Sequence, residues 1–334
     1  MKKTIVIAEA GVNHNGDLGL AKKLVDAAKN AGADIVKFQT FTAQNLVTTY
    51  AEKANYQKTT TRKKESHFEM LKNLELSRKN HKILMSYCKD KKIEFLSSAF
   101  DLEDLAFLNS LKLKRFKVPS GEITNLPYLK SIAKFNKQTI LSTGMSSMNE
   151  IKRSLEVLKK NGLHKSKIII LQCNTEYPTP LKDVNLLAMK EMKEVFGTRV
   201  GYSDHSDSLI TPSLAVALGA EVIEKHLTLN KNMSGPDHSA SLSPKEFKKM
   251  IDMIRDTEIS LGTKLKKLTK SEEKNISVVR KSIVAKKEIK KGEIFTEENI
   301  TTKRPAKGIS PMKWDKIIGK KSKKNFKEDQ LISI

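Results

Sequence analysis

The sequence of 334 residues has only two cysteines, Cys88 and Cys173, which lie far apart and form no CxxC pair. Neither a disulfide framework nor a thiolate metal site is indicated, and both thiols are expected to be reduced. No apolar run approaches the roughly 18 residues that a membrane span needs, so no membrane partner is expected. The first apolar stretch ends at Glu9, too early for a secretory signal, which predicts a cytoplasmic location.

Acidic residues are outnumbered: 38 Asp and Glu stand against 62 Lys and Arg, a formal net charge of +24. Clustered basic side chains can neutralise nucleic-acid phosphates. The lysines here recur along the whole chain, however, and no aromatic residues that could stack bases are interleaved with them. We therefore expect no nucleic-acid partner, and we interpret the lysines as solvated helix faces whose charge favours anionic substrates.

Eight short apolar or β-branched runs recur, each ending on small or polar residues. They are TIVIAEA, DIVKFQT, IEFLSSAF, RFKVPSG, QTILSTGM, KIIILQC, RVGYSDH and EVIEKHLT. Amphipathic helical patterns alternate with them, with start signals at Asp17, Ser147 and Ser243 and with Gly32 after the first helix. Strand followed by helix, eight times, predicts an α/β fold, the (β/α)8 TIM barrel. A doubly wound sheet is disfavoured because AEAGVNHNG stands where a GxGxxG fingerprint would follow the first strand.

Two segments depart from the repeat. The polar stretch from Phe41 to about Lys79 is far longer than an ordinary βα loop, which predicts an excursion at the barrel rim with a functional use. After Gly262 the charged tract KLKKLTKSEEKN lacks apolar periodicity. We predict a catalytic barrel domain over residues 1–262, a linker over 263–276 and a small domain of short β structure over 277–334. This small domain is near the lower size limit for independent folding, and we expect it to pack against a larger domain.

Polar side chains collect where the predicted strands end, and in a barrel these carboxyl ends share one mouth. Any one of them could merely mark a strand leaving the core, but Lys37 and Lys117 interrupt apolar strands, and lysine is rarely buried without a partner. As an ensemble they predict an active site. The set is Glu9, Asn13, Lys37, Gln39, Ser98, Lys117, Ser120, Glu122, Ser142, Thr175, Asp204, His205, Glu224 and His226.

Two kinds of chemistry are compatible with this set. His205 and His226, at the ends of successive strands, suit an open divalent-metal site that polarises a carbonyl, although two hydrogen-bonded histidines without metal remain an alternative. The two lysines with nearby serines suit a phosphate group. Together these features indicate C–C bond formation. A Schiff base on Lys37 or Lys117, as in aldolases, stays open at this point because it needs only a lysine that is held neutral.

Nine motifs in order resemble the sialic acid synthase family over nearly the whole chain: AEAGVNHNG, VKFQT, KVPSGE, LSTGM, EYPTP, GYSDHS, IEKHLT, SGPDHSAS and KRPAKGISP. The tail resembles the antifreeze-like (SAF) domain of that family. The resemblance implies condensation of phosphoenolpyruvate with an N-acetylated aminosugar of the mannosamine type, giving a nine-carbon α-keto acid and phosphate. It also implies assistance by a divalent metal, Mn2+ or Mg2+.

The resemblance carries roles over position by position. It implies that Glu9, Lys37, Lys117 and Glu122 are catalytic or supporting, that Lys37, Ser98, Lys117, Ser120 and Ser142 bind phosphoenolpyruvate, and that His205 and His226 bind the metal. It further implies a sugar subsite of Gln39, Thr175, Tyr177, Glu224, Asp237 and Arg304, with Glu9 close by to orient or deprotonate a water. Arg304 would come from the C-terminal domain of the other chain in a swapped homodimer.

The acceptor sugar is the least determined feature. Thr175 stands two positions before Tyr177, where some members of the family carry asparagine. We predict the branch that includes legionaminic acid synthases, with 2,4-diacetamido-2,4,6-trideoxymannose as acceptor. N-acetylneuraminate synthesis from N-acetylmannosamine is the alternative within the family, and a metal-independent Schiff-base aldolase is the alternative of another class.

Overall fold

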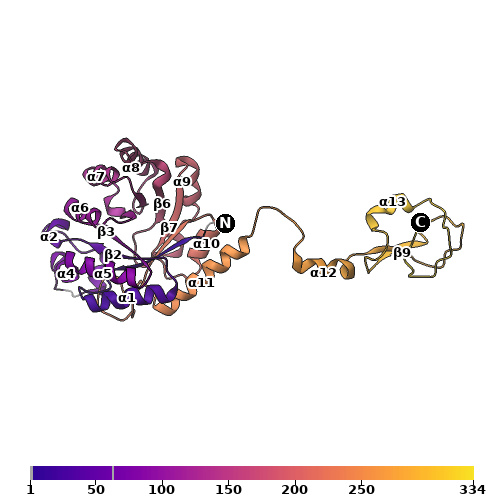
Figure 1. Cartoon of the computed structure of the whole chain (residues 1–334), viewed down its shortest axis with the longest axis horizontal. Coiled ribbons are helices and arrows are strands. Elements are labelled where there is room, and N and C mark those ends of the chain that lie inside the picture. The colour runs from indigo at the N-terminus through magenta and orange to yellow at the C-terminus, as the bar shows by residue number, and fades with distance from the viewer. Residues whose placement is uncertain (1–2, 62–63) are drawn as a thin grey trace. The chain divides into compact units, whose positions relative to one another are not determined.

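The computed structural model describes residues 3–61 and 64–334, and the chain divides into two compact units, Met1–Gly262 and Thr263–Ile334. In the first unit, eight strands close into a parallel barrel in chain order, so the predicted TIM barrel is confirmed (Figure 1). The strands are β1 (Ile5–Gly11), β2 (Ile35–Thr40), β3 (Glu94–Ala99), β4 (Arg115–Val118), β5 (Gln138–Ser142), β6 (Ile168–Cys173), β7 (Arg199–Asp204) and β8 (Val222–His226).

An outer layer of helices surrounds the strands. Asp17 caps the first helix by accepting from the Leu20 amide, and Gly32 ends it with φ 91°, a left-handed conformation that glycine adopts freely. Capping boxes at Ser147 and Ser243 begin two others, as predicted. The helices are α1 (Leu18–Ala31), α5 (Arg78–Asp90), α6 (Leu102–Ser110), α7 (Leu126–Lys134), α8 (Met148–Lys160), α9 (Ala188–Phe196), α10 (Thr211–Ala217) and α11 (Pro244–Leu261). Short 3-10 turns are η1 (Ser120–Glu122), η2 (Lys165–Lys167) and η3 (Leu181–Asp183).

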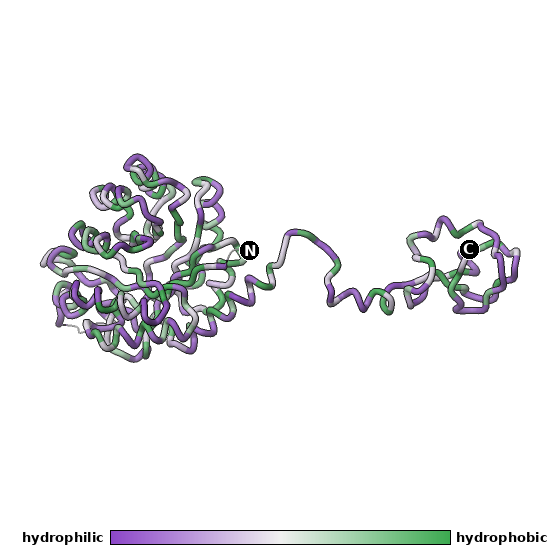
Figure 2. The backbone as a smooth tube through the Cα atoms, in the orientation of Figure 1, coloured by the Kyte–Doolittle hydropathy of each residue, from purple (hydrophilic) through white to green (hydrophobic). Residues whose placement is uncertain are grey.

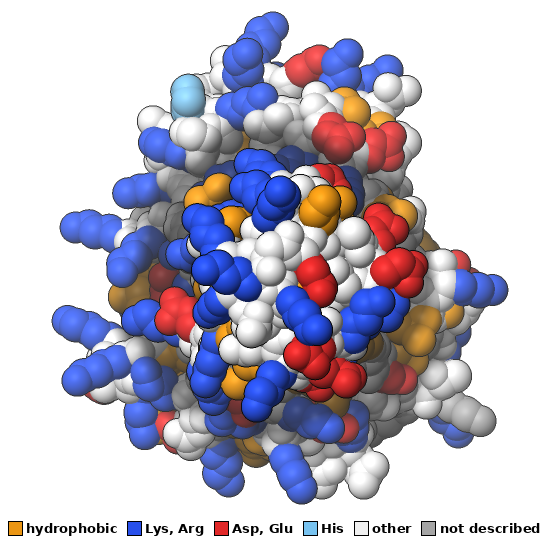
Figure 3. Space-filling view, turned by 90° about the vertical axis from the view of Figure 1, so that its right-hand side faces the viewer, with side chains coloured by type: hydrophobic (Ala, Val, Ile, Leu, Met, Phe, Trp, Pro, Cys, Tyr) orange, Lys and Arg blue, Asp and Glu red, His pale blue; other side chains and the backbone are white. Residues whose placement is uncertain are grey.

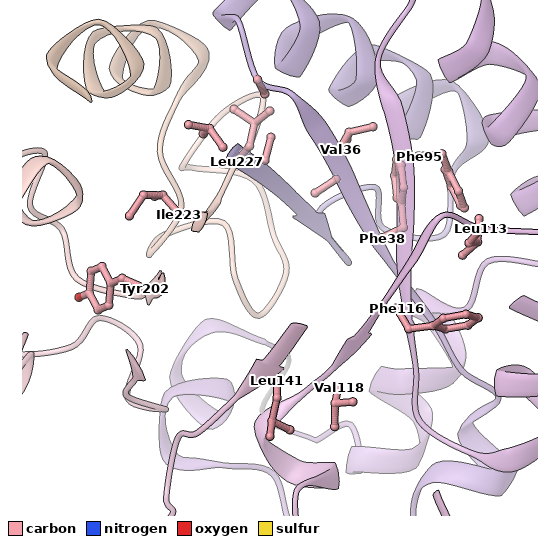
Figure 4. Close-up of a cluster of buried hydrophobic side chains, with 14 of the residues drawn as sticks. Val36, Phe38, Phe95, Leu113, Phe116, Val118, Leu141, Tyr202, Ile223 and Leu227 are labelled. Atoms are coloured by element: carbon pink, nitrogen blue, oxygen red, sulfur yellow. The ribbon is translucent and has the colours of Figure 1, made fainter. Parts of the chain in front are cut away.

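The core has two parts because strand side chains alternate between the two faces of the barrel. Outward-facing residues pack under the helices, as Figure 4 shows for Phe38, Phe95 and Phe116, and the first two of these rings stack 5.8 Å apart. Inward-facing residues fill the barrel itself with an aliphatic layer of Ile7, Ile35, Leu96, Ile140, Ile169, Leu171 and Val222. The tube in Figure 2 shows the resulting mixture of polar and apolar positions along each element.

The same alternation determines where the polar residues lie. Two positions beyond the inward Ile7 of β1 comes Glu9, and two beyond Ile35 of β2 comes Lys37. Leu96 is likewise followed by Ser98 on β3. An aliphatic layer near the start of the strands is therefore followed by a polar layer near their carboxyl ends, which is the end where barrel enzymes hold their active sites.

The rim excursion between β2 and α5 is structured. It contains α2 (Ala43–Leu46), α3 (Asn55–Thr60) and α4 (His67–Leu74). Its apolar side chains form a small core with Val12, which follows β1, and they are Phe41, Ala43, Met70, Leu71 and Leu74. The excursion is thus tied to the barrel by burial as well as by its two chain ends.

The second unit has a separate small core of Ile283, Ala285, Ile289, Phe295, Ile300, Ile317, Phe326 and Ile332. Its elements are β9 (Ser282–Ala285) paired antiparallel with β10 (Ile300–Lys303), then η4 (Pro311–Lys313) and α13 (Trp314–Ile317). A further helix, α12 (Lys270–Val279), occupies residues that we expected to be mostly linker. Thr269 donates to Glu272 at its start, and its side chains remain unburied, so local capping rather than apolar periodicity marks this helix.

Lys and Arg predominate among the charged side chains on one face of the surface (Figure 3). On the face shown in Figure 3, acidic side chains lie among the many Lys and Arg side chains rather than apart from them. No helix in the described ranges is long and apolar enough to cross a membrane.

Candidate active site

A cavity of about 210 Å³ opens where the barrel strands end. Twelve of the residues predicted to serve the site line it, together with Cys173, Ser203 and several loop residues. The lining is Glu9, Lys37, Gln39, Ser98, Phe100, Lys117, Pro119, Ser120, Gly121, Ser142, Met145, Cys173, Thr175, Tyr177, Ser203, His205, Glu224 and His226.

A buried cluster of two lysines and two glutamates forms its floor. The Lys37 ammonium lies 2.8 Å from Glu9 and 3.8 Å from Glu224, and Lys117 lies 3.1 Å from Glu224. Burial alone would raise the pKa of Glu224, but Lys117 and Lys37 outweigh it and lower that pKa to about 2. The Lys37 pKa is raised, because Glu224 and Glu9 more than offset the effect of burial. The cluster therefore presents fixed ammonium groups to an anionic ligand.

Glu9 differs from Glu224 in its electrostatics. Burial raises the pKa of Glu9, and the attraction of Lys37 opposes that rise only in part. Gln39 donates to the other carboxylate oxygen at 3.3 Å, which fixes the orientation of the group. A carboxylate with a raised pKa, such as Glu9, is better suited to take a proton near neutral pH than Glu224, whose pKa is about 2.

Hydroxyl groups flank the lysines. Lys37 donates to Ser98 at 3.4 Å, and the Ser120 hydroxyl accepts from the Gly144 amide at 3.0 Å. A Cβ atom at Gly144 would lie 2.6 Å from Thr175 Cγ2 and 2.8 Å from Ser120 Oγ, so this close approach requires glycine. The Ser142 hydroxyl is buried without a hydrogen-bond partner among the described residues. A ligand oxygen at this point would satisfy it.

The two histidines lie at the other side of the cavity, with ring centroids 5.4 Å apart. His205 Nδ1 donates to the Asn174 carbonyl at 2.5 Å, so Nε2 is the nitrogen that offers a lone pair when the ring is neutral. Burial alone would lower the pKa of His205, but Cys173 and the Asn174 carbonyl outweigh it and raise that pKa. Burial, together with the charge of His205, lowers the pKa of His226 well below its usual value. Its buried Nδ1 has no hydrogen-bond partner in the described structure and lies 3.8 Å from Asp237.

These residues fit a divalent metal in an open site. Neutral imidazoles are ordinary ligands of such ions. The described residues contain no group of three His, Cys, Asp or Glu side chains set to hold a metal. Two imidazoles would therefore hold the ion, and water and substrate oxygens would complete its coordination.

Five predicted residues lie outside the lining: Asn13, Glu122, Asp204, Asp237 and Arg304. Asn13 is buried and donates from Nδ2 to the Leu227 carbonyl and to Ser241 Oγ, each at 2.9 Å. Glu122 is largely buried on η1, where it accepts from Asn125 Nδ2 at 2.6 Å. Asp237 is buried beside His226, and burial followed by the charge of Glu9 raises its pKa to about 7. Arg304 is exposed on the second unit.

Asp204 was predicted at the mouth, and this was wrong. Its carboxylate is buried in a 2.7 Å ion pair with Lys225 and accepts from Ser206 and Thr211. The reason is the alternation along β7, where Ser203 points into the barrel and Asp204 points out. Ser203 and Cys173, both on inward positions, were missed, although counting two residues from Gly201 and from Leu171 would have found them.

A closed barrel with lysines, glutamates and histidines gathered at its carboxyl mouth has the architecture of a barrel enzyme. Residues 24–266 match the model of the NeuB family and residues 280–334 match that of the SAF domain. The chain is a member of the NeuB family and ends in a SAF domain.

Similar proteins agree with this assignment. The N,N'-diacetyllegionaminic acid synthase of Campylobacter jejuni subsp. jejuni serotype O:2 is 58% identical, with 99% of each chain covered. The protein of that name from Legionella pneumophila subsp. pneumophila is 45% identical over 96% of this chain and 91% of its own. The crystal structure of N-acetylneuraminic acid synthetase from Leptospira borgpetersenii serovar Hardjo-bovis superposes with a TM-score of 0.73. It is 33% identical over 82% of this chain and 90% of its own.

Proposed function

We propose that this protein is an N,N'-diacetyllegionaminate synthase, a transferase that condenses phosphoenolpyruvate and water with 2,4-diacetamido-2,4,6-trideoxymannose and releases phosphate. The single observation that carries this choice is the 58% identity, along the whole length, to a protein named for that product. N-acetylneuraminate synthesis is the second candidate, and the protein named for it is 33% identical.

Phosphoenolpyruvate would bind over the lysine and glutamate cluster. Its phosphate and carboxylate are anions, and Lys37 and Lys117 are ammonium donors fixed by buried carboxylates. The hydroxyls of Ser98, Ser120 and Ser142 lie on the same side of the cavity, and that of Ser142 has no partner of its own. Burial keeps competing water away from these contacts and strengthens them.

The sugar would bind between this subsite and the histidines, against Gln39, Thr175, Tyr177 and Glu224, with Asp237 behind His226. A divalent ion held by His205 and His226 would supply Lewis-acid polarisation of the open-chain sugar aldehyde. The side chains around it orient the aldehyde so that carbon 3 of phosphoenolpyruvate attacks the carbonyl carbon. Carbon 2 then carries the positive charge, which the carboxylates of Glu9 and Glu224 stabilise.

Water must next add to carbon 2. Glu9 lies at this end of the cavity with a raised pKa, which suits it to orient the water and accept its proton. The tetrahedral intermediate then expels phosphate by C–O cleavage, and Lys37 and Lys117 stabilise the leaving anion. Phosphoenolpyruvate labelled with 18O in the bridging position should deliver the label to phosphate, and label retained in the keto acid would contradict this route.

Schiff-base chemistry is disfavoured by the same electrostatics. An amine must be neutral to attack a carbonyl. The carboxylates of Glu224 and Glu9 raise the pKa of Lys37, and Lys117 is ion-paired with Glu224 at 3.1 Å. Borohydride with substrate should therefore leave the enzyme active.

The assembly that we propose is a cytoplasmic homodimer in which the SAF domain of one chain serves the barrel of the other, presenting Arg304 to the N-acetyl group of the sugar. Two features support a partner for this unit. It has only eight buried apolar residues in its main core, and α12 leaves its side chains, Val278 and Val279 included, unburied. Such a helix is marginal alone and gains stability by packing on a second surface.

A phosphate-release assay with phosphoenolpyruvate and each candidate aminosugar tests the reaction and the acceptor together. The expected result is release with 2,4-diacetamido-2,4,6-trideoxymannose at a kcat/KM at least about tenfold above that with N-acetylmannosamine, a difference of about 1.4 kcal/mol. A preference for N-acetylmannosamine would make the second candidate correct. Release with neither sugar would refute the proposed function.

A further inference from the structure

Three aromatic rings are stacked in a column that ends on a histidine of the site. Tyr56 of α3 stacks on Tyr177 with centroids 5.0 Å apart and planes at 29°. Tyr177 in turn stacks on His205 at 4.1 Å and 25°. The rim excursion therefore contributes the outermost ring of a column whose innermost ring is an imidazole of the active site.

Each contact of His205 restricts one freedom of its ring. The hydrogen bond from Nδ1 to the Asn174 carbonyl fixes the rotation of the imidazole within its plane. The stacked Tyr177 ring fixes the plane itself, and its hydroxyl lies 3.1 Å from Nε2. The Nε2 lone pair that a metal would use lies in the ring plane, so stacking on the aromatic face does not cover it, and an ion bound there would replace the Tyr177 hydroxyl as its partner. Whatever holds Tyr177 flat also holds this lone pair in one direction.

Tyr56 is itself held in place by its helix. Thr60 at the end of α3 donates to the Pro236 carbonyl at 3.2 Å, which joins the helix to the loop after β8. Lys53 donates to Thr61 at 2.9 Å and lies 3.3 Å from Glu65, so the chain on both sides of α3 is fastened together. Tyr56 is not among the described residues that line the cavity. Tyr56 can therefore affect the site through its contact with Tyr177.

We propose that Tyr56 is a positioning residue for the metal site: it presses Tyr177 against His205 and so sets the direction of the His205 lone pair before any ion binds. The inference rests on the proposed function in one respect, the binding of a divalent ion by His205 and His226. It assigns to the rim excursion a part in metal affinity that the excursion's sequence, polar and outside the barrel repeat, does not reveal.

The test measures metal binding directly, on the full-length protein without substrate. Free Mn2+ is followed by electron paramagnetic resonance as MnCl2 is titrated into chelator-treated protein. Tyr56→Ala should raise the Mn2+ dissociation constant roughly tenfold, as is usual when a residue that orients a metal ligand is removed. Tyr56→Phe keeps the ring and should stay within about twofold of the unmodified protein. Tyr50→Ala is the matched control, because Tyr50 is on the same excursion and is 91% exposed.

A double variant separates positioning from direct contact. In a Tyr177→Ala background, adding Tyr56→Ala should leave the dissociation constant unchanged, since Tyr56 acts only through Tyr177. Full additivity of the two effects would overturn the inference. In turnover assays, Tyr56→Ala should raise the Mn2+ concentration for half-maximal rate while kcat at saturating Mn2+ stays within about threefold.

The remaining outcomes are also decisive. If the unmodified protein binds Mn2+ and Tyr56→Ala binds it equally well, the inference is wrong while the proposed function stands. If the unmodified protein binds no divalent ion, the metal role of His205 and His226 in the proposed function is wrong, and the positioning role of Tyr56 is wrong with it. If circular dichroism shows that Tyr56→Ala does not fold, Tyr56→Leu, which keeps a bulky apolar side chain and lacks the aromatic face, takes its place with the same expected shift.

Discussion

At the scale of single residues, the site depends on charges that are buried in pairs. A lysine or glutamate at these positions would be costly to bury alone, and each is stabilised by the opposite charge beside it. The two glutamates are nevertheless unequal, because Glu224 is near two ammonium groups and Glu9 pairs closely with one. One carboxylate therefore stays ionised as a structural anion while the other has the raised pKa that proton transfer needs.

Glu9→Gln tests that difference. The amide keeps the shape of the side chain and removes the group that accepts the proton, so kcat for phosphate release should fall by about 10² or more. Thermal unfolding must show that the variant is folded, because Lys37 loses its closest carboxylate. Glu122→Gln is the comparison, since its carboxylate bonds to Asn125 outside the cavity lining, and its loss should be much smaller. Equal losses in the two variants would remove Glu9 from the water step.

Removal of the metal is the second test at this scale. Dialysis against an excess of chelator should abolish phosphate release, and added Mn2+ should restore it, because the sugar aldehyde needs a Lewis acid. His205→Ala and His226→Ala should each lose at least about 100-fold in activity and should not be rescued by the Mn2+ concentration that restores the unmodified protein. Full activity in the presence of chelator would refute metal assistance.

At the scale of elements, the eight strands and their helices were predictable because each carries its own local pattern. Short continuous apolar runs, capping residues and a glycine after α1 are all recognisable within about a dozen residues of sequence. Whether a polar residue at a strand end points into or out of the barrel was harder to predict. Asp204 and Ser203 differ by one position, and only the register of β7 decides which of them faces the cavity.

The rim excursion could be recognised from its length but not resolved into α2, α3 and α4. Those helices are four to eight residues long, too short for a clear helical period. Their position depends on contacts with Val12 and with the loop at Pro236, which are distant in sequence. Tyr56 was missed for the same reason, because nothing near it in the chain indicates that it meets Tyr177.

The loop between β1 and α1 gives a prediction about pH. Burial, with a contribution from the charge of His81, lowers the pKa of His14 to about 4, from 6.5 in an unfolded chain. The folded protein therefore favours neutral His14. This stabilisation is complete above pH 6.5 and is lost as the pH falls from 6.5 toward 4, because only the unfolded chain takes up the proton in that interval. The expected loss is about 3 kcal/mol.

His14→Asn should reduce this acid sensitivity. The asparagine oxygen can accept the bond that His14 Nδ1 accepts from the Gly16 amide, at 3.0 Å, and it does not titrate. Urea unfolding at pH 6.5 and pH 4.5 should show a smaller fall in the free energy of unfolding for this variant than for the unmodified protein. Replacing the exposed His164 by asparagine is the control and should change the pH dependence little. Parallel pH profiles for His14→Asn and the unmodified protein would show that His14 is not responsible.

At the scale of the whole molecule, the small second unit is strongly basic, and whether it serves a barrel active site can be tested. The second unit carries 21 Lys and Arg against 9 Asp and Glu in residues 263–334. A positive surface of this kind attracts anionic substrates, but it does not by itself identify the barrel that it serves. Residue Arg304, next to Pro305 and exposed, is the group through which the proposed swap can be tested.

Mixed dimers decide whether Arg304 acts within its own chain. One full-length chain carries Lys117→Ala, which disables its barrel and keeps Arg304. The other carries Arg304→Ala and keeps an intact barrel. If the SAF domain serves the partner's barrel, the mixed dimer pairs one intact barrel with one intact Arg304, and activity should rise well above that of either parent, toward half that of the unmodified dimer.

The controls for this experiment are the two parent dimers, each of which must be folded and impaired, and an affinity-tag pull-down that verifies the mixed dimers. Subunit exchange should raise activity with the same time course as mixed dimers appear, because only the exchanged species combines the two intact parts. Verified mixed dimers that are no more active than the Arg304→Ala parent would mean that each Arg304 serves its own barrel. The swapped arrangement would then be wrong, while the chemistry proposed for the barrel would be untouched.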